Sequence, residues 1–301
     1  MKNDFILSRR QFLNGATAIS ALVLAKPTSL FAKDQKPVAN KICAFEKPLQ
    51  FLSYDETAEV LAESGFHGVE ATVRPGGHVL PEKVEEDLPR FIDALKKRKL
   101  EMTVLTSGIN SVDSPHAEKV LRTAAKLGVK RYRMLWYPYD LQKPILPQLD
   151  EIRPKLKKLA ELNRELGLIA LYQNHAGAKM VGAPLWDIYD LIKDFNPKEI
   201  ALAYDIRHAA VEGGLSWPLQ FNLVKSHLGA VFVKDCAWEN GKLKNVPLGE
   251  GMVDKKFFAM LKETNFAGPI SIHVEYLDPS KDKKILGEAF RKDLATLKSL
   301  L

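Results

Sequence analysis

The chain has 301 residues, 46% of them hydrophobic and 27% charged, a composition that excludes disordered and fibrous proteins and allows a large buried core. Its formal net charge of +7 is mild, and its lysines and arginines are spread along segments of helical period as a solvated face. We therefore expect no nucleic-acid partner.

The first residues resemble a twin-arginine export signal. Arg9 and Arg10 precede an apolar run at residues 15–25, which is too short to span a bilayer and is followed by small residues. Further residues of such a signal are present, namely Ser8, Phe12 and Leu13. We predict a signal peptide at residues 1–32, export by the Tat machinery and a periplasmic location, with a cytosolic basic helix as the alternative.

From Lys41 onward, short apolar runs alternate with longer segments of helical period, which is typical of βαβ units on a parallel sheet. The predicted strands are residues 41–45, 67–72, 100–107, 131–137, 168–174, 200–206, 230–235 and 269–275. The predicted helices lie near residues 55–64, 82–98, 116–127, 147–166, 185–194, 217–227, 254–264 and 283–300. Gly65, Gly128 and Gly167 each follow a predicted helix, as glycines at the C′ position do.

The repeated units contain no Gly/Ser-rich linker, and their combined length predicts one α/β domain, a (β/α)8 TIM barrel at residues 33–301. A doubly wound open sheet is the alternative, but no predicted strand is followed by the G-x-G-x-x-G turn of a dinucleotide site. Cys43 and Cys236 lie on or beside apolar strands, so we expect two buried free thiols rather than a disulfide.

Polar residues close the predicted strands, and in a barrel of this kind the groups that do chemistry lie at or just after the carboxyl ends of the strands. These residues are Glu46, Lys47, Glu70, Arg74, His78, Thr106, Ser107, Trp136, Gln173, Asn174, His175, Asp205, Arg207, His208, Lys234, Asp235, His273 and Glu275. A rim rich in His, Asp and Glu can bind a divalent metal or transfer protons, and an aromatic platform such as Trp136 can stack on a sugar.

Taken in order, the ends of the last four predicted strands read ALYQNH, AYDIRH, VFVKD and VEY. Their order and spacing resemble the xylose isomerase-like TIM barrel family of sugar phosphate isomerases and epimerases. The run GFHGVE, which ends at Glu70, is similar to the second strand of that family, and VPLGEGMVD, which contains Glu250, is similar to the loop after its seventh strand.

The resemblance implies a divalent ion, Mn, Mg, Co or Zn, held by a Glu after strand five, an Asp after strand six, a His on strand seven and a Glu after strand eight. Asp205 and Glu275 match this set, whereas Gln173 stands at the strand-five position and Phe232 at the strand-seven position. A Gln carbonyl can still bind a hard cation, but a phenyl ring cannot. The expected metal ligands are therefore Asp205, Glu275 and, more weakly, Gln173.

The same resemblance implies an isomerase of carbohydrate metabolism that acts on a small carbohydrate by abstracting a proton next to a carbonyl. Epimerases of this type use two glutamates, and an amide cannot replace one of them as a base, so proton return would fall to His175, His208 or Lys234. The expected catalytic residues are Glu275, Lys234, His208 and His175, with Glu275 as the base and Lys234 or His208 polarising the carbonyl oxygen. The expected substrate-binding residues are Glu70, Arg74, Trp136, Gln173, Asn174, Arg207 and Glu250.

Two other functions stay open at this point. One is a metal-independent lyase or hydrolase on a glycoside or an oxidised sugar, and the other is a non-catalytic barrel that binds carbohydrate. A homo-oligomer is also open.

Overall fold

A computed structural model describes residues 40–277 and 282–301 of the chain. The predicted signal peptide at residues 1–32 and the predicted start of the domain at residue 33 lie outside these residues. Within the described part of the chain, none of the helices combines the length and the apolar character needed to cross a membrane.

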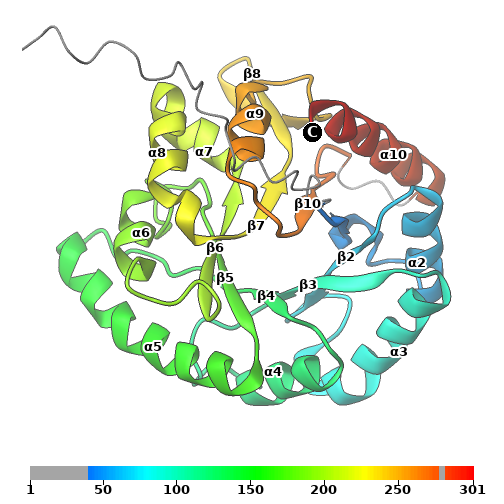
Figure 1. Cartoon of the computed structure of the whole chain (residues 1–301), viewed down its shortest axis with the longest axis horizontal. Coiled ribbons are helices and arrows are strands. Elements are labelled where there is room, and N and C mark those ends of the chain that lie inside the picture. Colours follow the sequence, from blue (N-terminus) through cyan, green and yellow to red (C-terminus); the bar gives the residue numbers. More distant parts are fainter. Residues whose placement is uncertain (1–39, 278–281) are drawn as a thin grey trace, which may run out of the picture. The chain divides into compact units, whose positions relative to one another are not determined.

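Eight parallel strands of the described chain close into a barrel in the order β1-β10-β7-β6-β5-β4-β3-β2 (Figure 1). The strands are β1 (Ile42–Phe45), β2 (Gly68–Val73), β3 (Glu101–Ser107), β4 (Arg131–Arg133), β5 (Ile169–Gln173), β6 (Ile200–Asp205), β7 (Leu228–Val233) and β10 (Ile270–Ile272). The first and last strands pair directly, Ile42 beside Ile270, which closes the sheet. The prediction of a (β/α)8 barrel is confirmed, and the open-sheet alternative is excluded.

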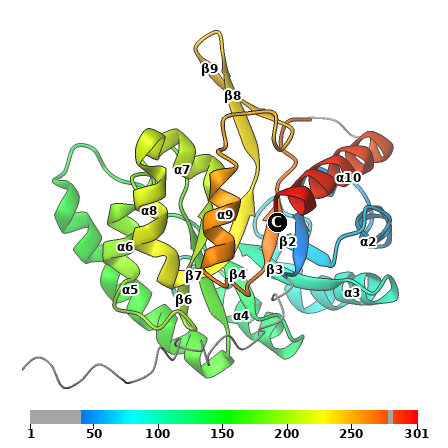
Figure 2. The ribbon, with the colours of Figure 1, turned by 45° about the horizontal axis from the view of Figure 1, so that its top comes forward.

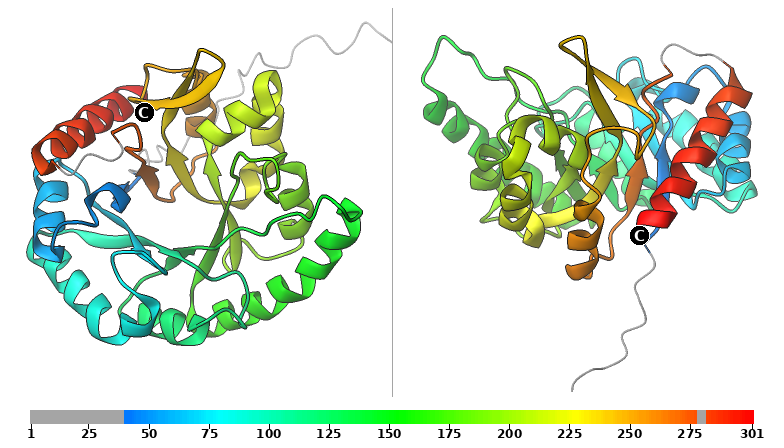
Figure 3. Two further views of the ribbon diagram at one scale, coloured as in Figure 1. Left: turned by 180° about the vertical axis from the view of Figure 1, so that it is seen from behind. Right: turned by 90° about the horizontal axis from the view of Figure 1, so that it is seen from above.

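Helices surround the strands, as the view from behind shows (Figure 3). They are α2 (Tyr54–Glu63), α3 (Val84–Lys97), α4 (Ala117–Lys126), α5 (Ile145–Leu166), α6 (Trp186–Ile192), α7 (Ile206–Gly213), α8 (Trp217–Val224), α9 (Lys256–Glu263) and α10 (Lys283–Leu300). Short 3-10 turns are η1 (Lys47–Leu49), η2 (Pro81–Lys83), η3 (Gly214–Ser216) and η4 (Lys225–His227). The glycines after α2, α4 and α5 have φ of 86°, 88° and 65°, so the predicted helix ends are confirmed.

Alternation along the strands decides which side chains face the inside of the barrel. A small apolar cluster separate from the main core contains Leu171, Ala201, Ala203, Ala230 and Phe232. Side chains two positions apart lie on the same face of a strand. Two positions after members of this cluster come Gln173, Asp205 and Lys234. Their side chains therefore also face the barrel interior, at its carboxyl end.

The structure differs from the predicted elements in several places, and two of these differences lie at the barrel mouth. Helix α7 begins immediately after β6, because the Asp205 side chain accepts a hydrogen bond from the backbone N–H of His208 and caps the helix. The predicted strand 200–206 is therefore one residue too long. The second difference is an unpredicted hairpin of β8 (Asp235–Glu239) and β9 (Lys242–Val246), which projects beside the barrel mouth (Figure 2).

The hairpin turn consists of Asn240 and Gly241, both with positive φ, the conformation that Asn-Gly favours in two-residue turns. Both cysteines are buried and free, as predicted.

Candidate functional site

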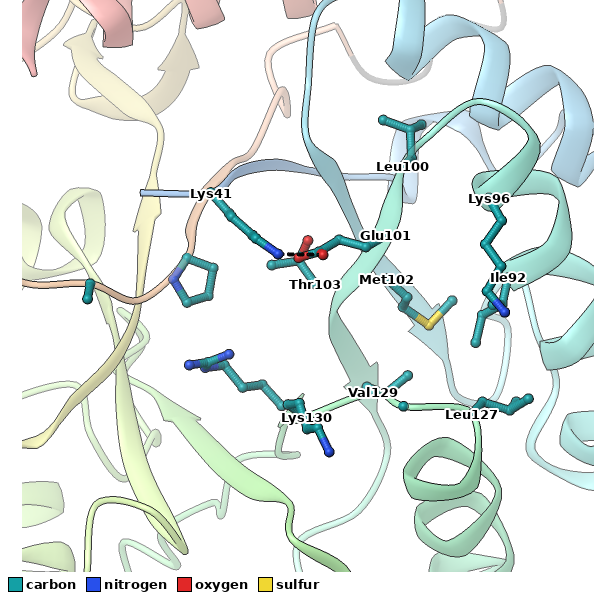
Figure 4. A pocket seen from close by; sticks show the side chains of 14 residues that line it. Lys41, Ile92, Lys96, Leu100, Glu101, Met102, Thr103, Leu127, Val129 and Lys130 are labelled. Atoms are coloured by element: carbon teal, nitrogen blue, oxygen red, sulfur yellow. Dashed lines mark hydrogen bonds and ion pairs between the residues drawn. The ribbon is translucent and has the colours of Figure 1, made fainter. Parts of the chain in front are cut away.

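Two cavities lie at opposite ends of the barrel. The larger, about 390 Å³, is bordered by residues at the starts of strands, among them Lys41, Glu101 and Arg131, and its Lys41–Glu101 ion pair is seen in Figure 4. The smaller, about 150 Å³, is bordered by residues at or after strand ends, among them Gln173 and Glu275. Because chemistry in barrels of this class occurs at the carboxyl ends, we take the smaller cavity as the candidate site and call it the mouth cavity.

The described residues that line the mouth cavity come from seven of the eight strand ends. They are Phe45, Lys47, Arg74, Ser107, Arg133, Met134, Leu135, Trp136, Gln173, His175, Lys234, His273 and Glu275. The predicted residues Arg74, Trp136, Gln173, His175, Lys234 and Glu275 are thus brought together. Their catalytic and binding roles stay predictions.

Lys234 lies between the two predicted carboxylate ligands. Its Nζ donates to Oε2 of Glu275 at 2.8 Å and lies 3.4 Å from Oδ2 of Asp205. Burial alone would raise the pKa of both carboxyl groups, but neighbouring positive charge lowers both pKa values below their usual range, with Lys234 contributing to each. Both acids are therefore ionised at neutral pH, with the amino group of one lysine bridging them.

This donor set does not fit a divalent ion. The carbonyl oxygen of Gln173, its only metal-binding atom, already accepts a hydrogen bond from Arg133 at 2.9 Å. The Phe232 ring offers no lone pair, and Nζ of Lys234 lies where a cation would approach the two carboxylates. Across the described ranges, no cluster of three or more His, Cys, Asp or Glu residues is arranged to hold a metal.

His175 is a neutral base with a defined tautomer. Its Nδ1 contacts the carbonyl oxygen of Ala176 at 2.9 Å, and since a carbonyl can only accept, Nδ1 carries the hydrogen and Nε2 keeps its lone pair. Burial, and then the charge of Lys234, lower the pKa of His175 below its ordinary value of 6.5. The imidazole is therefore unprotonated at neutral pH and borders the mouth cavity.

His208 packs behind His175, with ring centroids 3.9 Å apart. Arg207 donates to Nδ1 of His208 at 3.1 Å, and Nε2 of His208 lies 3.5 Å from Asp205. Burial lowers the pKa of His208 well below 6.5, and only 3% of the residue is exposed. His208 is thus placed to orient His175 and Asp205, away from the cavity surface.

Sequence reasoning missed Arg133, which lines the mouth cavity. Its guanidinium donates a hydrogen bond to the side-chain carbonyl of Gln173 and lies 3.7 Å from Oε1 of Glu70. Its Cζ lies 5.0 Å from the centre of the Phe45 ring. The predicted strand 131–137 made Arg133 an interior strand position, whereas β4 ends at this residue. The sequence did contain a signal for this position. Arg133 is an arginine two residues after Arg131, the first residue of the short strand.

Glu70, predicted to bind substrate, is fully enclosed beneath this arginine. Its oxygens accept hydrogen bonds from Thr106 and Ser271, each at 2.6 Å, and from Nε2 of His273 at 2.9 Å. Burial alone would raise the pKa of Glu70, but the charge and hydrogen bond of His273, followed by the charge of Arg133, lower it to about 2. The geometry makes Glu70 the buried counter-charge of the site.

Two other predicted binding residues are engaged elsewhere. The Asn174 side chain exchanges hydrogen bonds with the backbone N–H and C=O of Asp205 and so fixes the end of β6. Glu250 forms a surface ion pair with Lys292 and does not line the mouth cavity. Its loop is held by Asp235, whose carboxylate accepts from the backbone N–H groups of Gly249 and Gly251.

Residues 58–300 match the xylose isomerase-like TIM barrel family, and the chain belongs to this family. No curated protein matches the chain in sequence.

Similar solved structures share the fold. An apo 3-keto-D-glucoside 4-epimerase from E. coli is 19% identical, with a TM-score of 0.65, over 87% of this chain and 100% of that one. A probable 3-DHS dehydratase from Bacillus anthracis is 14% identical, with a TM-score of 0.66, over 86% and 98% of the two chains. An IOLI protein described with a binding zinc atom is 18% identical, with a TM-score of 0.68, over 86% and 97%.

Proposed function

We propose, taking this family membership as the premise, that the protein is an isomerase that abstracts a proton next to the carbonyl of a sugar or sugar-derived compound. The observation that carries the proposal is the meeting of a neutral imidazole, His175, and a carboxylate-bound amino group, Lys234, in one cavity at the strand ends. A base and a hydrogen-bond donor are what enolisation needs.

In the proposed step, Nε2 of His175 takes the proton from the carbon next to the carbonyl. The C–H electron pair forms the new C=C bond, and the carbonyl π electrons move to oxygen. Nζ of Lys234 donates a proton to that oxygen, which gives a neutral enediol and a neutral amine. In the second half, the hydroxyl on the carbon that lost its hydrogen gives its proton to the Lys234 amine, and the O–H electron pair forms the new C=O bond. The C=C electron pair then takes the proton of the His175 imidazolium at the former carbonyl carbon, which restores both side chains.

Glu275 supports Lys234 in this scheme rather than acting as the base. Its low pKa makes it a weak base, while its hydrogen bond to Nζ orients the amino group. Lys234 thereby supplies the electrophile that a divalent ion would supply in the site implied by the family resemblance. Trp136, 40% exposed at the cavity wall, offers an aromatic face to the substrate.

The first prediction concerns the base. His175→Asn should lower the rate of deuterium incorporation next to the carbonyl by about 10²- to 10⁴-fold, the usual contribution of a general base. Exchange is measured by NMR in D₂O over a panel of aldoses, ketoses and keto-sugar acids. Glu275→Gln should also lower turnover, because the amide oxygen can still accept a hydrogen bond from Nζ of Lys234 but no longer carries the negative charge that pairs with it.

Matched controls come from exposed residues of the same types. His116→Asn changes a surface histidine that already has a positive φ, which Asn tolerates, and Glu239→Gln changes a hairpin glutamate; neither should alter exchange. Unchanged exchange in His175→Asn, with wild-type folding, would rule out the assigned base.

A β-elimination that removes water is a second function with a specific observation in its favour. Because Gln173 is an amide, the site offers one base, whereas a two-base epimerase uses a pair. An elimination needs only one base, because it also begins with the abstraction of one proton next to the carbonyl. Mass analysis of the product separates them, because an isomer keeps the substrate mass and an elimination product is lighter by one water.

A further inference from the structure

We infer that the mouth cavity binds a substrate carrying an anionic group, a carboxylate or a phosphate, and that Arg74 and Lys47 hold this group. The inference rests on the proposed function and names its class of substrate, a sugar-derived acid or phosphate ester.

Positive charge dominates the described residues that line the cavity. Four of them are cationic, Lys47, Arg74, Arg133 and Lys234, and one, Glu275, is anionic. A cavity whose lining carries an excess of one sign of charge raises the local concentration of the opposite sign.

The cations differ in whether protein groups neutralise them. Lys234 is held by Glu275 and Asp205, and Arg133 by Gln173 and Glu70. Nζ of Lys47 lies 3.8 Å from Oε1 of Glu275, too far for a hydrogen bond. The one carboxylate of the cavity is thus already shared by two lysines.

Arg74 is the cation without a neutralising contact. Among residues 40–277 and 282–301, its side chain has no hydrogen bond and no carboxylate within 4.0 Å, although it is half-buried. Burial, and then the charge of Arg133, lower the pKa of Arg74, as expected for a half-buried guanidinium near another cation. A ligand anion would recover the free energy lost by this desolvation.

The backbone around Arg74 is fixed in advance of binding. Its N–H bonds the carbonyl of Val79, and its own carbonyl accepts from Gly77 at 2.8 Å. Gly76 has a φ of 68°, and a Cβ on Gly77 would lie 2.9 Å from the Arg74 carbonyl oxygen, so glycines permit this tight loop. The planar guanidinium on this fixed backbone is suited to a bidentate contact with a carboxylate or phosphate.

The strand order separates Arg74 from the proposed base. Arg74 follows β2 and His175 follows β5, three positions apart in the closed ring, whereas Lys47 lies near Glu275, the partner of Lys234. A substrate would therefore present its carbonyl to His175 and Lys234 while its anionic group contacts Arg74.

The test compares three parent sugars, glucose, galactose and mannose, with their uronates and their 6-phosphates by isothermal titration calorimetry. At least one uronate or 6-phosphate should bind wild type about 10- to 100-fold more tightly than its parent sugar, the range expected for hydrogen bonds to charged groups. Which of the two binds distinguishes a carboxylate from a phosphate.

Arg74→Gln should remove this preference. Arg74→Lys should retain part of it, because lysine keeps the positive charge but cannot form the bidentate hydrogen bonds of a guanidinium. Arg90→Gln is the matched control, since Arg90 forms exposed ion pairs with Glu86 and Asp87 on α3 and should leave the preference unchanged. Equal affinity for acids and parent sugars, or a preference that survives in a folded Arg74→Gln, would overturn the inference.

The deuterium-exchange assay keeps this result distinct from the proposed function. If anionic sugars bind preferentially through Arg74 but no substrate exchanges deuterium, the anion site is supported and the isomerase activity is rejected. If only neutral sugars exchange deuterium, the isomerase activity is supported and the anion site is rejected.

Discussion

Replacing Lys234 with alanine is expected to reduce the rate of enolisation by about 10²- to 10³-fold, the usual cost of removing one donor to a developing oxyanion. The physical reason lies in its contacts, because Nζ is the positive group nearest to both Asp205 and Glu275. Without it, the two carboxylates repel the negative oxygen that forms in the transition state. The rate is measured by deuterium exchange in D₂O.

Chemical rescue separates loss of the amino group from misfolding. Methylammonium added to Lys234→Ala should restore part of the rate, because it can enter the space left by the side chain and donate in its place. Lys244→Ala, which changes an exposed hairpin lysine paired with Glu239, is the control and should exchange normally. A folded Lys234→Ala with the wild-type rate would show that Lys234 has no part in the reaction.

Replacing Glu70 with leucine is expected to lower the free energy of unfolding by about 3–5 kcal/mol, the usual effect of removing one partner from a buried charge network. The change leaves Arg133 and His273 inside the barrel without their counter-charge. Glu101→Leu is the matched control, because its ion pair with Lys41 is exposed and should cost less than about 1 kcal/mol. Urea denaturation measures both, and equal effects would contradict the role of Glu70.

The pH dependence of stability gives an independent measurement on Glu70. Because folding lowers the pKa of Glu70 from 4.5 to about 2, its stabilisation is present above the unfolded value and is lost as the pH falls toward 2. The loss amounts to about 3 kcal/mol. The difference in unfolding free energy between wild type and Glu70→Gln should therefore shrink from pH 5 to pH 2.

Much of the fold could be predicted because its signals are local. Apolar runs and helical periods alternate along the chain, and Gly65, Gly128 and Gly167 punctuate them. The β8–β9 hairpin had a local signal too, the Asn240-Gly241 pair, but its strands lack the alternating apolar residues that mark a half-buried strand. Helix α7 was hidden because Asp205 both ends a strand and caps a helix.

The candidate site could be predicted only as a set of residues at strand ends. Which of them pair depends on distances between strands, and no local pattern encodes that Lys234 bridges Asp205 and Glu275. Arg133 was missed for the same reason, because its contacts are with residues of other strands. Gln173 lies on the neighbouring strand β5, and Glu70 lies on β2. The substitutions at 173 and 232 indicated an altered metal position, but only the folded arrangement brings a lysine amino group into it.

The most direct test of this account asks whether the reaction needs a divalent ion. Wild-type protein is stripped with EDTA, its metal content is measured by mass spectrometry, and deuterium exchange is followed before and after addition of Mn²⁺, Mg²⁺, Co²⁺ or Zn²⁺. We expect an unchanged exchange rate in metal-free protein, because Lys234 supplies the positive charge at Asp205 and Glu275. Exchange that disappears on stripping and returns with one stoichiometric metal ion would contradict it.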